Sequence, residues 1–482
     1  MISHLCAVWR AFVAERMQKF VSLGQIMPEK RPAEARAGDF HEIYADFIAQ
    51  KAADQASRCA QCGVPFCQTH CPLQNNIPDW LRLTAEGRLR EAYELSASTN
   101  SMPEVCGRIC PQDRLCEGAC VIEQSEHGAV TIGAVEKYLT ETAWREGWVA
   151  PLAPRAERSE SIGIIGAGPA GLAAAERMRQ RGYQVTVYDR HDRIGGLLIY
   201  GIPNFKLEKE VVLRRAQRLI DGGVKFELNC DVGDTISFAD LRAKHDAVLI
   251  ATGVYKPKPL NAPNDRGIVK ALDFLIAANR VGLGDDVPEF TSGALNAQGR
   301  RVVVIGGGDT AMDCVRTARR QGAASVTCLY RRDRANMPGS QREVAHAEEE
   351  GVAFDWLAAP KSVRAGKSPA VKAVRMQLGQ PDESGRQTPQ EQPGSAYEVP
   401  GDLIIAALGF DAEDLSDWNV ELTRWGTVKA DPISFVTNDP AVFAAGDIVR
   451  GASLVVWAIR EGRDAADAMH AFIQSQAKVA AE

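Results

Sequence analysis

One nucleotide-binding pattern occurs twice in this chain of 482 residues, and it constrains the fold more than any other feature. The first copy begins with an apolar strand at 161–165 and the glycine-rich turn Gly166–Gly171, which opens an alanine-rich helix. A second strand, 184–188, ends at Asp189, about 20 residues beyond the turn, and completes a dinucleotide-binding fingerprint. The glycines let the backbone approach a pyrophosphate at the helix N-terminus, and the aspartate can accept a hydrogen bond from a ribose 2′-hydroxyl.

The second copy differs from the first in two places. Strand 301–305 leads into Gly306-Gly-Gly308-Asp309-Thr310-Ala311, so that alanine replaces the third glycine. The next strand, 325–330, ends in Arg331-Arg332 instead of an acid. Two guanidinium groups can bind a ribose 2′-phosphate, which a carboxylate would repel. The first site is therefore predicted to bind FAD and the second NADPH, with solvated surface arginines as the alternative for the basic pair.

Later segments indicate that one nucleotide fold is inserted in the other. Apolar strands at 246–250 and 402–407 are each followed by a turn that contains glycine. Near the C-terminus, strand 442–445 leads into Gly446-Asp447 and a helical stretch at 454–472, where the aspartate can hold the ribityl chain of a flavin. Because this flavin segment follows the second fingerprint, we predict an α/β protein with two Rossmann-like domains, the NADPH fold inserted in the FAD fold.

Eight of the twelve cysteines lie in two short runs between Cys59 and Cys120. Each run holds four cysteines, and proline follows Cys71 and Cys110, as in ferredoxin-type runs. This arrangement favours two iron–sulfur cubanes over the two alternatives, zinc knuckles and disulfides. His70 lies inside the first run and is either a further ligand or a polar neighbour.

Composition excludes several classes of protein. The formal net charge is −6, without the basic stripe of a dedicated nucleic-acid binder. No stretch approaches the ~20 apolar residues of a membrane span. Arg10 interrupts the mildly apolar N-terminus, so a secretory signal is not expected. We therefore predict a cytoplasmic protein.

These features predict a division into a small helical iron–sulfur domain and two nucleotide-binding domains. The expected segments are 1–155 for the iron–sulfur domain, 156–285 and 411–482 for the two parts of the FAD domain, and 286–410 for the NADPH domain.

Several local patterns carry further expectations. The apolar spacing at 77–96 indicates helix beside the cysteines, and the stretch Gly379–Gly394, rich in Gly, Pro, Gln and Ser, is predicted to be a surface loop. The charged segment Arg342–Glu350 is expected to form a helix with a solvated face. Three of the scattered cysteines are expected to be small buried thiols: Cys230, Cys314 and Cys328.

Six motifs occur together over nearly the whole chain: the eight-cysteine block, Gly166–Gly171, Ile194–Pro203 with Phe205-Lys206-Leu207, Gly306–Asp313, Tyr330–Arg332 with Met337-Pro338, and Ala444–Asp447. In this combination the chain resembles the small (beta) subunits of bacterial NADPH-dependent glutamate synthase. It is also similar to the N-terminal half of dihydropyrimidine dehydrogenase, which carries two 4Fe–4S clusters over the same cysteine pattern. Residues before about Met17 have no counterpart, so either Met1 or Met17 is the first residue of the protein.

The resemblance implies a ligand set for each cluster. Glu136 stands where the dehydrogenase has a glutamine ligand, and Cys106 is the alternative at that position. One cluster is expected on Cys59, Cys62, Cys67 and Cys120, and the other on Cys71, Cys110, Cys116 and Glu136.

The resemblance also implies an activity. NADPH passes a hydride to FAD, a step that needs positioning more than a catalytic acid or base, so no catalytic side chain is expected. Single electrons then pass through the clusters to a large (alpha) subunit that makes glutamate from glutamine and 2-oxoglutarate. The alternatives are a reductase of similar build that serves a ferredoxin- or sulfide-linked acceptor, and a structural adaptor with degenerate nucleotide sites.

The residues expected to contact the two nucleotides come from the fingerprints and the flavin motifs. For FAD they are Gly166, Gly168, Ala170, Gly171, Asp189, Gly196, Leu197, Thr252, Gly253, Gly446 and Asp447, and for NADPH they are Gly306, Gly308, Asp309, Thr310, Ala311, Arg331 and Arg332.

Overall fold

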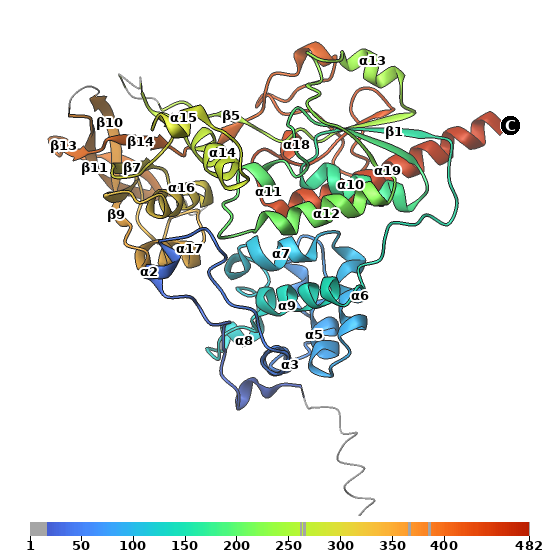
Figure 1. The fold of residues 1–482 in the computed structure, drawn as a ribbon, viewed down its shortest axis with the longest axis horizontal. Coiled ribbons are helices and arrows are strands. Elements are labelled where there is room, and N and C mark those ends of the chain that lie inside the picture. The colour runs from blue at the N-terminus through green and yellow to red at the C-terminus, as the bar shows by residue number, and fades with distance from the viewer. Residues whose placement is uncertain (1–16, 261–262, 264–266, 365–367, 384–386, 482) are drawn as a thin grey trace, which may run out of the picture.

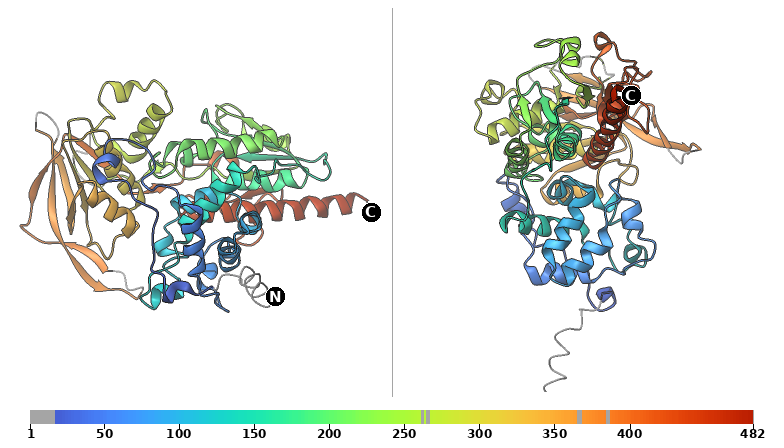
Figure 2. Two further views of the ribbon diagram at one scale, coloured as in Figure 1. Left: turned by 60° about the horizontal axis from the view of Figure 1, so that its bottom comes forward. Right: turned by 90° about the vertical axis from the view of Figure 1, so that its right-hand side faces the viewer.

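The computed structural model describes residues 17–260, 263, 267–364, 368–383 and 387–481. Cys6 and the apolar N-terminal segment with Arg10 lie outside this part of the chain. A helical domain sits against two α/β folds that lie side by side (Figures 1 and 2). None of the helices in the described ranges combines the length and the apolar character needed to cross a bilayer.

The helical domain is built from short helices around the cysteine runs. Proline occupies the first turns of α5 and α7, where its missing N–H group costs no hydrogen bond. The predicted helical stretch at 77–96 forms two helices, since the chain turns at Gly87 with φ +74° between them. The elements are η1 (Lys19–Val21), α2 (Ala33–Arg36), α3 (Ala49–Ser57), α4 (Phe66–Thr69), α5 (Ile77–Ala85), α6 (Leu89–Thr99), α7 (Pro103–Ile109), η2 (Gln112–Arg114), α8 (Val121–Gln124) and α9 (Ile132–Arg145).

The first nucleotide fold is a five-stranded parallel sheet in the order β16-β4-β1-β2-β3. Its strands are β1 (Ser161–Ile165), β2 (Gln184–Tyr188), β3 (Lys225–Glu227), β4 (Ala247–Ile250) and β16 (Val442–Ala444). The late strand β16 pairs with β4, as the inserted arrangement predicts. The other elements of this fold are α10 (Pro169–Gln180), α11 (Leu197–Tyr200), α12 (Lys209–Asp221), α13 (Phe238–Ala243), η3 (Ser416–Trp418), α18 (Asp447–Arg450) and the long α19 (Val455–Ala481).

The second nucleotide fold repeats this plan with the order β6-β14-β7-β8-β9, again all parallel. The strands are β6 (Val269–Lys270), β7 (Arg301–Ile305), β8 (Ser325–Tyr330), β9 (Ala353–Trp356) and β14 (Leu403–Ala406). The helices are α14 (Ala271–Gly282), α15 (Pro288–Thr291), α16 (Asp309–Arg320) and α17 (Gln341–Glu349).

An antiparallel sheet extends the second fold and corrects one expectation. The stretch Gly379–Gly394 is not a loop, because its two arms pair as the end of β11 and as β12. Its polar composition hid this, since a strand exposed on both faces needs no apolar alternation. The strands of this sheet are β10 (Ala358–Arg364), β11 (Ala370–Pro381), β12 (Gln387–Glu391) and β13 (Tyr397–Pro400).

The chain passes between the two folds at a short antiparallel ribbon, β5 (Lys256–Pro257) with β15 (Phe410–Asp411). Strand β6 comes after the outgoing arm of this ribbon and pairs with β14 of the second sheet. The crossover therefore precedes residue 285, where the FAD segment was expected to end, because the apolar pattern alone did not say which sheet β6 joins.

The helical domain and the first nucleotide fold share one hydrophobic core. Met102, Val105 and Cys106 pack in the same cluster of buried side chains as Ile162 and Ile164 of β1. This shared core holds the cysteine-bearing helices directly against the first sheet and its helices.

Candidate functional site

The glycines of the first turn fit close approach of a ligand. Gly166 has φ +108°, and a Cβ atom there would lie 2.4 Å from the carbonyl oxygen of Ala251. A Cβ at Gly171 would lie 1.9 Å from the carbonyl oxygen of Gly166, so this glycine lets the helix pack on the strand. At Gly168 a Cβ would meet no protein atom within 4 Å, and the residue lines a cavity. The open space above Gly168 is where a pyrophosphate would approach.

Asp189 holds the turn as well as facing the cavity. Its Oδ2 accepts a hydrogen bond from the backbone N–H of Ala167 at 2.7 Å, and its Oδ1 accepts from that of His191 at 2.8 Å. Each carboxylate oxygen keeps a further lone pair that could accept from a ribose hydroxyl.

Other residues predicted for FAD come together around the same cavity. Burial raises the pKa of the Asp447 carboxyl, which also accepts a hydrogen bond from the Ser453 hydroxyl at 2.8 Å. Gly446, with φ +80°, and Gly196, with φ +53°, shape the backbone beside the cavity and are absent from its lining. The predicted residues that line the cavity are Gly166, Gly168, Ala170, Asp189, Leu197, Thr252, Gly253 and Asp447.

The second turn has the same geometry. A Cβ at Gly306 would lie 2.2 Å from the carbonyl oxygen of Ala407, and a Cβ at Gly308 would meet nothing within 4 Å. Ala311 is fully buried at the position of the third glycine. Asp309 and Thr310 line the cavity that the first turn also faces.

Arg331 and Arg332 follow β8 beside the second turn, outside the lining of the cavity. Neither guanidinium forms an ion pair with a described residue, and Nε of Arg332 is buried without a hydrogen-bond partner. Arg334 differs, because its guanidinium contacts Glu348 at 2.9 Å. Two unpaired cations at the end of this strand fit a 2′-phosphate.

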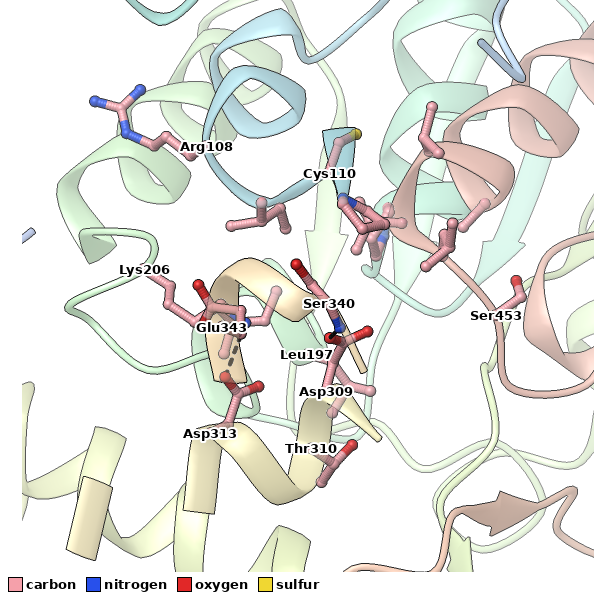
Figure 3. A pocket seen from close by; sticks show the side chains of 18 of the residues that line it. Arg108, Cys110, Leu197, Lys206, Asp309, Thr310, Asp313, Ser340, Glu343 and Ser453 are labelled. Carbon is pink, nitrogen blue, oxygen red and sulfur yellow. Dashed lines mark hydrogen bonds and ion pairs between the residues drawn. The ribbon is translucent and has the colours of Figure 1, made fainter. Parts of the chain in front are cut away.

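A cavity of about 340 Å³ connects the two turns (Figure 3). An ion pair joins the folds across it: Nζ of Lys206, from the first fold, lies 2.9 Å from Oδ1 of Asp313 on α16. Burial raises the pKa of Asp313 to about 6 even though Lys206 opposes the shift. The sequence alone assigned neither residue a role, although Lys206 belongs to the motif Phe205-Lys206-Leu207 and Asp313 ends the motif Gly306–Asp313.

Two smaller cavities gather the cysteines. The first cluster cavity is lined by Cys59, Cys62, Cys67 and Cys120, which is the ligand set expected for one cluster. The second cluster cavity is lined by Cys71, Cys106, Cys110, Cys116 and Glu136. His70 lines neither cavity and its Nδ1 lies 2.9 Å from the carbonyl oxygen of Phe66, as a polar neighbour would.

The electrostatics of these cavities fit a cationic occupant. All eight cysteines of the block are free, and burial raises the thiol pKa values of Cys59 and Cys71 to about 11 and that of Cys67 to about 12. Such thiols become thiolates only when a metal compensates their charge. No three acidic, His or Cys side chains in the described ranges converge as a single metal ion requires. The thiols instead surround a volume, which suits a cluster whose ligands bind separate irons.

Two residues, Glu136 and Cys106, are candidates for the fourth ligand of the second cluster. Burial raises the pKa of Glu136 to about 8, and its Oε1 accepts weak hydrogen bonds from Ser96 and Asn100 at 3.4 and 3.5 Å. The Cys106 thiol lies 3.8 Å from the Asn100 side-chain oxygen. Both side chains line the cavity, so Glu136 stays the predicted ligand and Cys106 its alternative.

The three cavities lie in series. Cys110, Gln112 and Val456 line both the large cavity and the second cluster cavity. The two cluster cavities share Ile132. The second cluster site is thus the one in contact with the nucleotide cavity.

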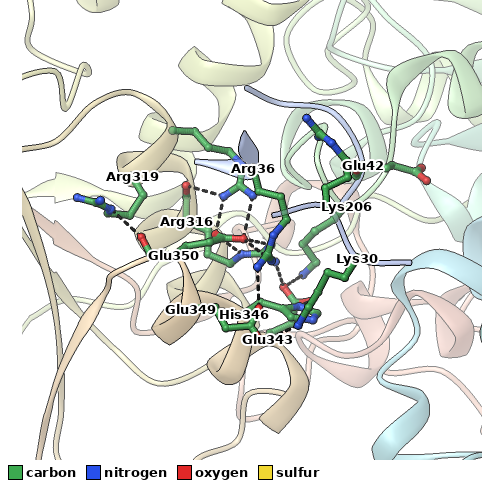
Figure 4. A network of polar contacts seen from close by, with 12 residues as sticks. Lys30, Arg36, Glu42, Lys206, Arg316, Arg319, Glu343, His346, Glu349 and Glu350 are labelled. Atoms are coloured by element: carbon green, nitrogen blue, oxygen red, sulfur yellow. Dashed lines mark hydrogen bonds and ion pairs between the residues drawn. The ribbon is translucent and has the colours of Figure 1, made fainter. Parts of the chain in front are cut away.

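The charged helix α17 has the expected solvated side, where Gln341, Glu348 and Glu349 are exposed, but its other side turns Glu343 and His346 inward (Figure 4). Glu350, which follows it, is buried and accepts hydrogen bonds from Arg316, Arg320 and Arg36. Burial alone would raise the pKa of Glu350, but the arginines lower it to about 2. Arg36 belongs to residues 17–48, which we call the N-terminal strap, so this network ties the strap to the second fold.

Comparisons with known proteins agree with this arrangement. Residues 36–148 match the family described as dihydropyrimidine dehydrogenase domain II with a 4Fe-4S cluster, and residues 160–462 match the pyridine nucleotide-disulphide oxidoreductase family. Mycobacterium tuberculosis FprA in complex with NADPH shares the fold, with a TM-score of 0.56 at 19% identity over 67% of this chain and 86% of that one.

Curated proteins are similar to this chain over most of its length. The putative oxidoreductase AegA of Escherichia coli K12 is 46% identical over 94% of this chain and 70% of its own. The glutamate synthase [NADPH] small chain of Azospirillum brasilense is 61% identical over 96% of this chain and 98% of its own. The chain therefore belongs to the family of NADPH-dependent glutamate synthase small chains.

Proposed function

We propose that this chain is the electron-input subunit of a cytoplasmic glutamate synthase. It oxidises NADPH and delivers the electrons to a large chain that makes glutamate from glutamine and 2-oxoglutarate. The observation that carries the proposal is the single cavity between the two glycine turns, with the second cluster cavity on its wall. The 61% identity to a small chain over 98% of its length supports the choice of partner.

Residues of the two nucleotide sites have different binding roles. Gly168 and Gly308 leave space for the pyrophosphates of FAD and NADPH at the N-termini of α10 and α16. Asp189 selects a free ribose in the first site, and Arg331 with Arg332 selects a 2′-phosphate in the second. The ion pair between Lys206 and Asp313 keeps the two folds in register across the cavity.

When bound, NADPH supplies a hydride, FAD accepts it, and the clusters carry single electrons onward. The protein contributes orientation and exclusion of water, and no side chain is assigned a proton transfer. Cys110 and Gln112 place the second cluster at the wall of the nucleotide cavity, and the first cluster cavity lies beyond it at Ile132.

A second candidate is the same electron-transfer chemistry with another acceptor. The 46% identity to AegA favours this candidate, because AegA is named as a putative oxidoreductase and not as a glutamate synthase chain. The higher identity to the Azospirillum small chain favours the glutamate synthase partner.

The test uses the full chain, purified without oxygen. NADPH added alone should bleach the flavin absorbance, and addition of the large chain with glutamine and 2-oxoglutarate should restore it while glutamate accumulates. Bleaching that only a ferredoxin- or sulfide-linked acceptor reverses would assign the second candidate. A flavin that NADPH does not bleach contradicts both.

A further inference from the structure

Two loops that belong to different domains meet at the floor of the nucleotide cavity. One is the cluster loop, Gln112–Glu117. It begins two residues after the predicted cluster ligand Cys110 and contains the predicted cluster ligand Cys116. The other is the docking segment, Pro338–Arg342, which leads from the second sheet into α17. Four polar contacts connect these two loops, and sequence reasoning assigned a role to none of them.

The first two contacts fix the docking segment to the cluster loop and to the second glycine turn. The Ser340 hydroxyl donates to both carboxylate oxygens of Asp113 at 3.1 Å, while its backbone N–H donates to Oδ1 of Asp309 at 3.0 Å. Arg114 donates to the carbonyl oxygen of Pro338. Ser340 and Asp309 lie together in Figure 3, within the cavity that Cys110 also lines.

The other two contacts come from Arg342. Its guanidinium donates to Oε2 of Glu117 at 2.7 Å and to the side-chain oxygen of Gln112 at 3.3 Å. The Glu117 side chain is only 3% exposed, and its second oxygen accepts from the backbone N–H of Gly133 at 3.0 Å. Arg342 is therefore the cation that neutralises a buried carboxylate next to a cluster ligand, and it comes from the second nucleotide fold.

The charge of this carboxylate matters for a cluster on Cys116. The reduction potential of an iron–sulfur cluster depends on nearby charge, burial and hydrogen bonding. An unpaired buried carboxylate disfavours the added electron, and low polarisability around it strengthens the effect. Gln112 strengthens the same contact, because its amide donates to the carbonyl oxygens of Cys106 and Gly107 while its side-chain oxygen accepts from Arg342.

We propose that Arg342 is a positioning residue for the second cluster: by pairing with Glu117 it keeps the reduction potential of that cluster from falling. The consequence is that the second cluster accepts electrons readily only while the second nucleotide fold is seated on the cluster loop. This inference rests on the proposed function, because only a loaded cluster has a potential.

The experiment is a redox titration of the full chain, loaded with FAD and both clusters and followed by EPR. In Arg342→Gln, one of the two cluster potentials should shift to more negative values while the other stays. Arg342→Lys keeps the charge and should show a smaller shift. In Glu117→Gln the same cluster should shift the opposite way, because the carboxylate is lost and the cation remains. Arg364→Gln is the matched control, since Arg364 pairs with exposed Glu398 and contacts neither the cluster loop nor the docking segment.

The outcomes separate the inference from the proposed function. A wild-type chain that binds no iron, or whose flavin NADPH does not bleach, would end both. Normal iron and bleaching, with unchanged potentials in Arg342→Gln and Glu117→Gln, overturns the inference alone. Equal shifts of both clusters also overturn it, because they indicate a general loosening. If Arg342→Gln does not fold, the sign of the Glu117→Gln shift decides.

Discussion

At the scale of single residues, the first glycine turn contains one position where a side chain would block only a bound ligand and another where it would disrupt the fold. Gly168 has φ −82°, a conformation open to any residue, and its missing Cβ faces empty cavity. Gly171 has its missing Cβ against a carbonyl oxygen. The first position is thus reserved for a ligand and the second for packing.

Replacement of Gly168 by valine should give a folded chain without FAD, because the side chain fills the approach of the pyrophosphate. The flavin absorbance of the purified protein, with circular dichroism as a check of folding, measures this. Gly171→Ala is the contrasting variant and should damage the fold itself, since its Cβ would lie 1.9 Å from an oxygen. Full FAD content in Gly168→Val would remove the first turn from the site.

Coenzyme preference should depend on Arg331 and Arg332. Each charge-assisted contact to a 2′-phosphate contributes about 1.5–3 kcal/mol, so the double alanine variant should lose most of its preference for NADPH over NADH. The ratio of kcat/KM for the two coenzymes is the measurement. Arg334→Ala is the control, because that guanidinium is already paired with Glu348. An unchanged ratio in the double variant would place recognition of the phosphate elsewhere.

At the scale of elements, the parallel strands were predictable and the polar ones were not. The bounds expected for β1, β2, β7 and β8 are those observed, because each is a short apolar run that ends at a glycine turn or a charged residue. Strand β12 was not predicted, because an exposed polar strand shows no alternation of apolar and polar residues. The buried side of α17 was not predicted, because Arg36 and Glu350, whose ion pair holds it, are 314 residues apart in the chain.

The candidate site divides in the same way. The glycines, Asp189 and the eight cysteines follow from spacing that chemistry imposes on a short segment. Lys206 with Asp313, and Arg342 with Glu117, become partners only when the domains pack together, so no local pattern announces them.

Helix α9 places Glu136 at the second cluster cavity. If Glu136 on α9 is the fourth ligand, Glu136→Ala should alter the EPR spectrum of one cluster and leave the other, since a carboxylate differs from thiolate in charge and softness. Cys106→Ala should then be nearly silent. Loss of a cluster in Cys106→Ala, with Glu136→Ala unaffected, would exchange the two roles and leave electron transfer in place.

At the scale of the whole molecule, the N-terminal strap connects the helical domain to the second nucleotide fold. Arg36 binds Glu350 at 3.1 Å and Glu349 at 2.6 Å, and the Tyr44 hydroxyl lies 2.9 Å from Nε2 of His346. Figure 4 shows Lys30 and Arg36 of the strap beside Glu349 and Glu350 of the charged cluster.

Arg36→Gln should loosen the strap. The loss of charge-assisted hydrogen bonds costs about 1.5–3 kcal/mol of the stability of this contact, less than leaving a lone charge buried would, because Glu350 keeps Arg316 and Arg320. Faster hydrogen exchange and proteolysis within residues 17–48 are the readouts. Lys30→Gln removes a partly exposed pair with Glu349 and should cost under about 1 kcal/mol. Equal protection in Arg36→Gln and wild type would contradict this role of the strap.

The shared core and the β5–β15 ribbon together decide where this chain can be cut and recombined. An exchange at the linker before β1 would strip Met102 and Val105 from the core they share with Ile162 and leave apolar surface in water on both halves. An exchange at the ribbon cuts the backbone only within two short paired strands at the neck of the insert, Lys256–Pro257 and Phe410–Asp411, and it preserves the contacts of the insert if Asp313, Arg342 and Glu350 are retained. Engineers who want a different coenzyme should therefore transplant the insert as a cassette through this neck, and leave the cluster domain and the first sheet as one inherited unit.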